Sequence, residues 1–180
     1  MAYIYAVLHS PAYRLRYAQF LKVDFPRIPT PPNLEFFETL ATKGAALIEF
    51  HLLESSELSR LITRYPVPGD NLVDAGYPKY LAPGQPDPVT GTPLGAGRVY
   101  LSSDDVKSGR RGQYFDGVPP EVWEFQIGGY QVCEKWLKDH RERTLSHDDL
   151  IHYEKIVAAL AATTRLMTEI DAAISAWPIS

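Results

Sequence analysis

The amino-acid sequence predicts an α+β fold, in which a small, partly irregular β-sheet with loops is supported by long helices. Apolar residues recur at helical spacing near both ends of the chain, the middle is rich in proline and glycine, and short β-like runs follow that middle. A length of 180 residues with 45% hydrophobic residues suits a single domain with a packed core. Within it we expect helical support in residues 1–60, sheet and loops in 61–129, and helices in 130–180.

The first part of the chain predicts three helices. Residues 2–8 are almost wholly apolar but too short to span a membrane, so they predict a packed helix. Ser10 followed by Pro11 forms an N-cap with proline at the first helical position, which predicts a second helix over residues 11–21. Asn33 is placed to cap a third, longer helix. The expected buried face of this helix consists of Leu34, Phe37, Ala41, Ala45, Ile48 and Leu52.

The centre of the chain predicts loops followed by a small sheet. Residues 65–97 contain seven prolines and six glycines and show neither the period of a helix nor that of a strand. Three β-like runs follow at residues 98–101, 113–115 and 122–127, separated by polar and glycine-containing turns. The two glycines at 128–129 end the last run, so we expect a sheet of short strands in this part of the chain.

The last part of the chain returns to helical patterns. Residues 130–140 predict a helix in which Glu134 stands four positions before Lys138, the favourable order for an ion pair. Ser146 as N-cap and Asp149 three positions later predict the start of a long final helix. We expect this final helix to pack on a long apolar partner, because its apolar residues alternate three- and four-residue steps as in a coiled coil. These residues are Tyr153, Ile156, Leu160, Thr163, Met167, Ile170, Ile174 and Trp177. Within the chain the partner is the long helix of the first part, and another subunit or a further domain is the alternative.

Composition and motifs exclude several classes of function. A net charge of −4 gives no global positive field, so an anionic partner must be met by a local patch. The single cysteine, Cys133, excludes an internal disulfide and a multi-cysteine zinc site, and it suits a cytoplasmic location. Phosphate-binding, dinucleotide-binding and hydrolase motifs are absent. We therefore expect no catalytic residue, no metal, no cofactor and no membrane partner in this segment.

Two groups of reactive side chains have chemical and structural explanations, and we favour the structural ones. Asp148 and His152 have a spacing that could hold a metal, but acidic residues in a first helical turn already stabilise free N–H groups. Cys133 with His140 or His147 would supply a nucleophile and a base, but a cysteine in an amphipathic helix is usually a small buried hydrophobe. Both groups therefore favour a binding protein over an enzyme.

Positive charge is concentrated in one segment between two of the predicted strands. This segment contains Lys107, Arg110 and Arg111, and no acidic residue separates them from Gln113 and Tyr114. Its glycines allow close approach to a nucleic-acid backbone, whereas the alternative explanation is an ordinary solvated hairpin tip.

Several separate blocks of the sequence, in one order, are similar to a known family. The most informative block spans residues 123–139 and includes Gly128-Gly129-Tyr130-Gln131; the others are residues 3–14, 24–29, 113–119 and 143–146, with His152 and Tyr153. The chain resembles the C-terminal target recognition domain of type ISP restriction-modification enzymes and related single-chain adenine methyltransferases. The resemblance implies a module that recognises double-stranded DNA. It also implies a parent chain with nuclease, ATP-dependent translocase and N6-adenine methyltransferase domains, which use S-adenosylmethionine, ATP and Mg.

The resemblance and the residue chemistry together give the candidate contacts. Arginine fits guanine and glutamine fits adenine bidentately, so the base-reading candidates are Arg110, Arg111, Gln113 and Tyr114. The phosphate-binding candidates are Arg98, Lys107, Tyr130, Gln131, Lys135, Lys138, Arg141 and Arg143. The alternative function is a helical protein-interaction or spacer module, which docks a partner through its last helix and does not touch DNA.

Overall fold

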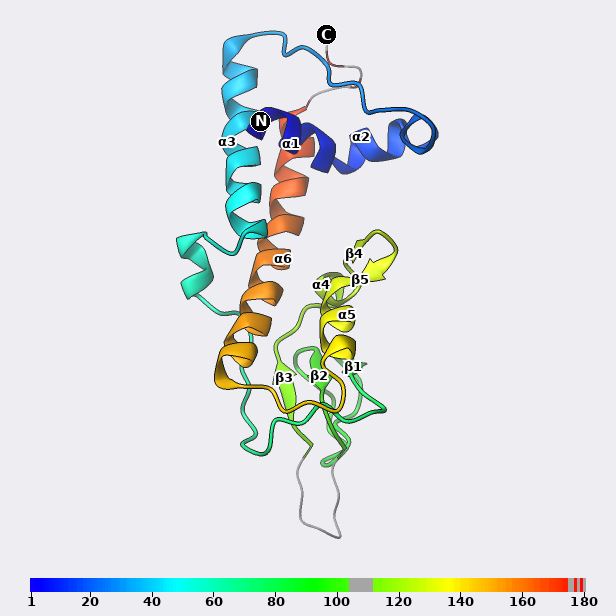
Figure 1. Cartoon of the computed structure of the whole chain (residues 1–180), viewed down its shortest axis with the longest axis vertical. Coiled ribbons are helices and arrows are strands. Elements are labelled where there is room, and N and C mark those ends of the chain that lie inside the picture. Colours follow the sequence, from blue (N-terminus) through cyan, green and yellow to red (C-terminus); the bar gives the residue numbers. More distant parts are fainter. Residues whose placement is uncertain (104–111, 175–176, 178, 180) are drawn as a thin grey trace. The chain divides into compact units, whose positions relative to one another are not determined.

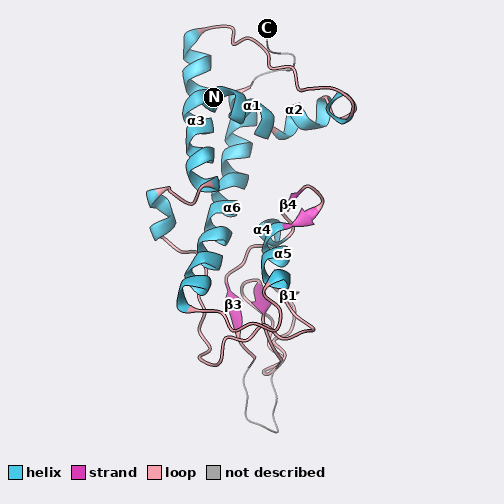
Figure 2. Ribbon diagram, in the orientation of Figure 1, coloured by secondary structure: helices cyan, strands magenta, loops and turns pink. Residues whose placement is uncertain are grey.

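The computed structural model describes residues 1–103, 112–174, 177 and 179, and these form two compact units (Figure 1). The first unit comprises Met1–Glu57 with Ala162–Ser180, and the second comprises Leu58–Ala161. Helix α6 (His147–Ala173) contributes residues to both units. The described strands all belong to the second unit and form two small antiparallel sheets (Figure 2). The predicted α+β class is confirmed.

The first unit begins with two consecutive helices. Helix α1 (Ala2–His9) is followed at once by helix α2 (Pro11–Arg16). The Ser10 hydroxyl accepts a hydrogen bond from the Tyr13 N–H at 3.0 Å, which confirms the predicted N-cap. Helix α2 is shorter than predicted, because the chain leaves the α-helix after Arg16 and forms only a 3₁₀ turn, η1, at Phe20–Lys22.

Helix α3 (Leu34–His51) begins where predicted but buries a different face. The Asn33 side chain accepts from the Phe36 N–H at 2.8 Å, which confirms the cap. A Cβ added at Gly44 would lie 2.0 Å from the Ala2 carbonyl oxygen, so α1 approaches α3 at a position that only glycine permits. This close approach sets the buried face one residue away from the predicted one. The buried residues are Leu40, Gly44, Leu47 and Phe50, and the predicted Leu34, Phe37, Ala45 and Leu52 are exposed.

Polar contacts also join three helices of the first unit. The Tyr5 hydroxyl and His51 Nδ1 are 2.6 Å apart, and His51 Nε2 lies 3.0 Å from Thr163 Oγ1 on α6. The His9 ring centroid lies 5.3 Å from that of His51. Burial lowers the pKa of both histidines, so neutral imidazoles join α1, α3 and α6. Both histidines therefore serve in packing.

The second unit is built around the three-stranded antiparallel sheet β1-β2-β3. The strands are β1 (Lys79–Leu81), β2 (Arg98–Tyr100) and β3 (Tyr114–Asp116). Strand β1 lies in the stretch predicted to be irregular, whereas β2 and β3 lie within one residue of the predicted runs. Val99 pairs with Phe115, and both side chains are fully buried. They belong to a core with Val73, Leu101, Val118, Val122, Cys133, Leu137, Leu145, Tyr153 and Val157.

The third predicted strand, residues 122–127, is wrong over its first half. Pro120 stands at the first position of a short helix, α4 (Pro120–Trp123), which buries Val122 and Trp123 in the core. Only β4 (Gln126–Ile127) is extended. The β-like run that predicted a strand therefore combines one helical turn with two extended residues.

A glycine turn leads from β4 to the next helix. Gly128 and Gly129 have φ angles of 60° and 84°, which a β-carbon disfavours, and they connect β4 to β5 (Tyr130–Gln131). Helix α5 (Val132–Asp139) follows directly, two residues later than predicted.

Helix α6 begins with the predicted capping box. The Asp149 N–H donates to Ser146 Oγ at 3.1 Å, and the Ser146 N–H donates to Asp149 Oδ2 at 2.8 Å. In the first unit, the Lys43 Nζ on α3 lies 2.8 Å from Glu169 Oε2 on α6, and the two helices run side by side (Figure 1). The predicted packing of the last helix on the long helix of the first part is confirmed for the C-terminal part of α6, whereas Tyr153 and Leu160 of the same apolar series belong to the core of the second unit.

Candidate nucleic-acid interface

The basic segment predicted to read bases belongs to the connection between β2 and β3. The Leu101 N–H donates to the Gln113 carbonyl at 2.8 Å, and the Gln113 N–H donates to Ser102 Oγ at 3.2 Å. Leu101, Ser102, Gly112 and Gln113 are all buried, so the described ends of this connection are fixed in the core. The predicted contacts of this connection that lie outside the described residues are Lys107, Arg110 and Arg111.

The Gln113 side chain is used inside the fold. Its Oε1 accepts from the Asn71 N–H at 2.9 Å, and its Nε2 donates to the Val67 carbonyl at 3.1 Å and to Asn71 Oδ1 at 3.0 Å. The residue is 1% exposed, and a Cβ at Gly69 would lie 2.6 Å from its amide carbon. Both amide donors are therefore engaged within the fold, which leaves none free for the predicted reading of adenine by Gln113. It holds residues 67–71 against the sheet instead.

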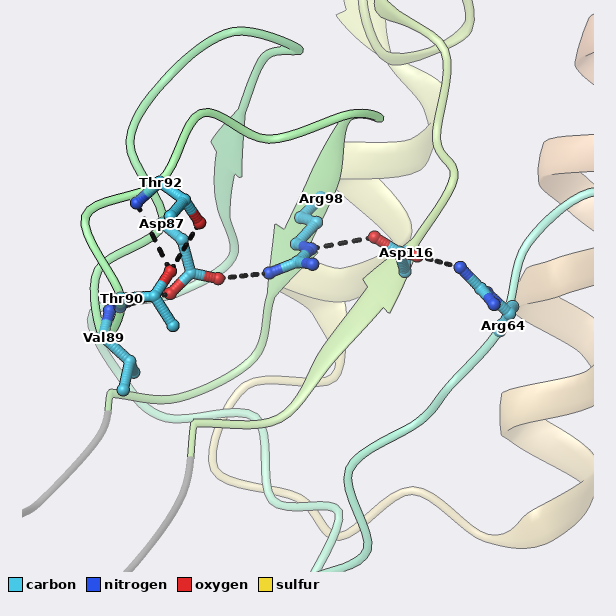
Figure 3. A network of polar contacts seen from close by, with 7 residues as sticks. All are labelled: Arg64, Asp87, Val89, Thr90, Thr92, Arg98 and Asp116. Atoms are coloured by element: carbon cyan, nitrogen blue, oxygen red, sulfur yellow. Dashed lines mark hydrogen bonds and ion pairs between the residues drawn. The ribbon is translucent and has the colours of Figure 1, made fainter.

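Arg98 on β2 lies between two carboxylates (Figure 3). Its Nε donates to Asp116 Oδ1 at 2.8 Å, and its Nη1 donates to Asp87 Oδ2 at 2.5 Å. Its Cζ lies 4.4 Å from the Tyr114 ring centroid, and its side chain is 20% exposed. Two acids already balance this charge, so Arg98 does not fit its predicted role as a phosphate contact. The Tyr114 ring also contacts the Tyr100 ring, with 4.9 Å between the ring centroids. Tyr114 is therefore in contact with both Arg98 and Tyr100, where the connection joins β3.

The same network fixes the turn at residues 87–92. Asp116 also accepts from Arg64 Nη2 at 2.9 Å, whereas Asp87 accepts from the Thr90 N–H at 3.0 Å and from that of Val89 at 2.9 Å (Figure 3). The Thr90 bond is the main reason that the pKa of Asp87 is lowered, and Arg98 adds to it. Burial alone would lower the pKa of Arg98, but its bonds to Asp116 and its other partners outweigh burial and raise it. The network thus holds the turn at residues 87–92 to strands β2 and β3 by charged contacts.

The two lysines of α5 are each paired with an acid on the same helix. Lys138 Nζ lies 2.8 Å from Glu134 Oε2, which confirms the predicted pair, and Lys135 contacts Asp139. Both lysines are exposed. A phosphate contact by either lysine would have to compete with its own carboxylate, so these two predicted contacts carry little free positive charge.

The β4–β5 turn presents Tyr130 at the surface, where it is 63% exposed. Ile127, its partner across the pair, is 60% exposed. Gln131 is the N-cap residue of α5 and makes no side-chain cap bond. The structure therefore places the predicted contacts Tyr130 and Gln131 next to the start of α5, on a strand pair with little burial.

The linker from α5 to α6 brings two further basic residues to the sheet. The Val73 N–H donates to the Arg143 carbonyl at 3.1 Å, which fixes the linker beside residues 71–73. Arg141 Nε donates to the Tyr77 carbonyl, and Lys79 Nζ on β1 lies 4.8 Å from the Tyr77 ring centroid. Arg141 and Arg143 were predicted as contacts. Lys79 was missed, because its strand lies in the proline-rich stretch and is revealed only by pairing with β2.

The surroundings of Cys133 favour its structural explanation. Burial raises the pKa of Cys133 to about 12, so its thiol is not a ready nucleophile. In the part of the chain that the structure describes, no three His, Cys, Asp or Glu side chains gather to hold a metal. Within the same residues, no helix has both the length and the apolar character needed to cross a bilayer.

Three solved structures share this fold. A nuclease-deletion mutant of the Type ISP restriction-modification enzyme LlaGI, in complex with a DNA substrate mimic, aligns with 93% of the chain at a TM-score of 0.61 and 20% identity. The DrdV–DNA complex aligns with 95% of the chain at a TM-score of 0.55 and 22% identity. The ATP-dependent Type ISP restriction-modification enzyme LlaBIII, bound to DNA, aligns with 100% of the chain at a TM-score of 0.58 and 16% identity. The chain spans 13%, 17% and 11% of these proteins, respectively.

The sequence comparison identifies the family. No curated protein is significantly similar to the chain in sequence. The sequence pattern of the family described as the Type ISP C-terminal specificity domain, however, matches residues 1–169, which confirms the resemblance found in the sequence. The chain therefore belongs to the family of Type ISP C-terminal specificity domains.

Proposed function

We propose that this chain recognises a specific DNA sequence, as the specificity domain of a longer restriction-modification polypeptide. The observation that carries the proposal is the family match over residues 1–169. The similar solved structures are complexes with DNA, which supports the same conclusion. The fold adds a physical reason, because the connection between β2 and β3 carries three basic residues and its described ends are fixed in a buried core.

In this proposal, base reading falls to Arg110 and Arg111, because Gln113 and Tyr114 are engaged within the fold. Arginine donates bidentately to guanine O6 and N7 in the major groove, which suits a G·C base pair in the target. Lys107, Arg141, Arg143 and the exposed Tyr130 and Gln131 would hold the DNA backbone without reading its sequence.

The longer polypeptide supplies the chemistry. The chain spans only 11–17% of the solved proteins that it resembles, so we infer that methyltransferase, translocase and nuclease activities reside in other parts of the parent. S-adenosylmethionine, ATP and Mg would bind those parts, in the cytoplasm. The contribution of this chain is to select the DNA site on which they act.

Fluorescence anisotropy with the purified chain and a duplex carrying its target tests the two arginines. Arg110→Ala or Arg111→Ala is expected to weaken specific binding by about 1–3 kcal/mol and to relax base preference at one position. Lys155→Ala, a change on α6, serves as the control and is expected to leave both quantities unchanged. Unchanged affinity and unchanged preference in both arginine variants would remove this connection from the proposal.

A protein-docking role for the first unit is a second candidate, which exposed apolar side chains favour. Leu15, Phe20, Val23 and Phe25 are between 69% and 90% exposed. Apolar side chains grouped along one stretch of chain are typical of a surface that another protein or domain covers. Light scattering after size-exclusion chromatography tests this role, because a tight dimer that does not respond to DNA would favour docking over DNA recognition.

A further inference from the structure

Tyr77 brings together two basic residues from distant parts of the second unit. Its carbonyl accepts a hydrogen bond from Arg141 Nε, although the two residues are 64 positions apart in the sequence. Its ring lies 4.8 Å from Lys79 Nζ, within the range of a cation–π contact. One residue thus holds an arginine through its main chain and a lysine through its ring.

Each of these three residues is fixed by the core of the unit. The Tyr77 N–H donates to the Asp74 carbonyl at 3.0 Å, and the Asp74 N–H donates to the carbonyl of the buried Leu101 at 2.9 Å. Lys79 is paired with Tyr100 across the β1–β2 ladder. On the linker, the residue after Arg141 donates its N–H to the Val73 carbonyl at 2.7 Å. The backbone of both cationic residues is therefore fixed by the core of the unit, and both side chains contact Tyr77.

The charges of Lys79 and Arg141 remain available. Both side chains are exposed, and within the described residues neither forms an ion pair with a carboxylate. The contrast is with Lys135 and Lys138, which face their own acids at i,i+4 spacing. Arg141 uses its Nε on Tyr77, which leaves the two Nη groups in their planar fork as donors.

We propose that Lys79 and Arg141 together bind one backbone phosphate of DNA, with Tyr77 as the residue that positions both. The Arg141 fork matches two phosphate oxygens, and the Lys79 ammonium adds a point charge with three donors. This contact rests on the proposed function and deepens it. It fixes the domain on the DNA without reading sequence, so it acts equally on target and non-target duplexes.

The test measures binding of a fluorescein-labelled duplex to the purified full chain at several salt concentrations between about 50 and 200 mM. Lys79→Ala and Arg141→Ala are each expected to weaken binding about 5- to 10-fold near 0.1 M salt, and the double substitution is expected to reduce the salt slope by about 0.9, the value of one lost phosphate contact. The losses are expected to be the same on target and random duplexes. Lys79→Arg, which keeps the charge, is expected to bind as the wild type does. Lys79→Gln, which removes the charge, is expected to bind as weakly as Lys79→Ala.

Lys155→Ala on α6, which is not among the proposed contacts, is the control and is expected to bind within about twofold of wild type. The phosphate contact is overturned if the Lys79 and Arg141 variants match this control, or if the affinity of the double variant falls without a change in salt slope. If the wild-type chain binds no duplex at any salt concentration, the proposed function fails and this contact fails with it. Thermal unfolding of each variant shows that the fold is retained.

Discussion

Replacing Arg98 with alanine is expected to destabilise the second unit rather than to weaken DNA binding directly. Arg98, Asp87 and Asp116 have side chains only 20%, 16% and 10% exposed, and the guanidinium donates to both carboxylates. Removing one partner of a buried ion pair costs about 3–5 kcal/mol, because the remaining charge stays buried without its counter-ion.

The remaining contacts place this change near the lower end of that range. After the substitution, Asp87 keeps its hydrogen bonds from the Val89 and Thr90 N–H groups. Asp116 keeps Arg64, whose side chain is 79% exposed and screened by solvent. We therefore expect Arg98→Ala to lower the free energy of unfolding by about 3 kcal/mol.

Urea unfolding followed by circular dichroism measures this change, and Arg64→Ala is the matched control. Arg64 bonds the same Asp116, but a surface pair contributes about 0–1 kcal/mol, so its removal is expected to cost no more than that. If Arg98→Ala and Arg64→Ala have equally small effects on stability while Arg98→Ala lowers DNA affinity, the structural role is refuted. Arg98 would then be the phosphate contact that the sequence predicted.

Two substitutions and a change of pH test the packing inside each of the two units. Gln113→Ala is expected to lower the free energy of unfolding by about 1–3 kcal/mol, because it leaves buried main-chain groups unpaired; unchanged thermal unfolding would contradict this. Gly44→Ala is expected to cost about 1–3 kcal/mol by forcing α1 away from α3, whereas Gly76→Ala, whose added Cβ meets nothing within 4 Å, is expected to be nearly neutral in the same assay. Burial lowers the pKa of His9 and His51 below 6.5, so the unfolded chain binds more protons. The free energy of unfolding is therefore expected to be highest above about pH 7 and to fall as the pH drops through about 6.5. A free energy of unfolding that stays constant from about pH 7 to 5 would contradict this.

Local signals in the sequence predicted the helix starts well. Ser10, Asn33 and the Ser146–Asp149 pair each satisfy free N–H groups within three residues, so their effect needs no knowledge of distant contacts. The family resemblance was likewise carried by blocks along the chain and is confirmed over residues 1–169.

Long-range contacts account for the features that were missed. The buried face of α3 depends on the approach of Ala2 to Gly44, and a glycine carries no hydrophobic signal. Strand β1 exists because Tyr80 pairs with Val99, although prolines surround it in the sequence.

Long-range contacts also decide which residues of the candidate site are available to DNA. Arg98 and Gln113 have the side-chain chemistry of DNA contacts, and only the fold reveals that Asp116 and Asn71 already engage them. Arg141 reaches Tyr77, the near neighbour of Lys79 in the sequence, through the tertiary structure alone. Residue type thus identifies groups that are able to bind DNA, and the contacts of each group decide which of them remain available.

The central claim, that this chain recognises a DNA sequence, is tested most directly by selection from a random duplex library with the purified chain, followed by sequencing of the bound fraction. We predict enrichment of one motif, which the double substitution of Arg110 and Arg111 by alanine abolishes while the fold is retained. Recovery of duplexes with no shared motif, or of none at all, would contradict the claim.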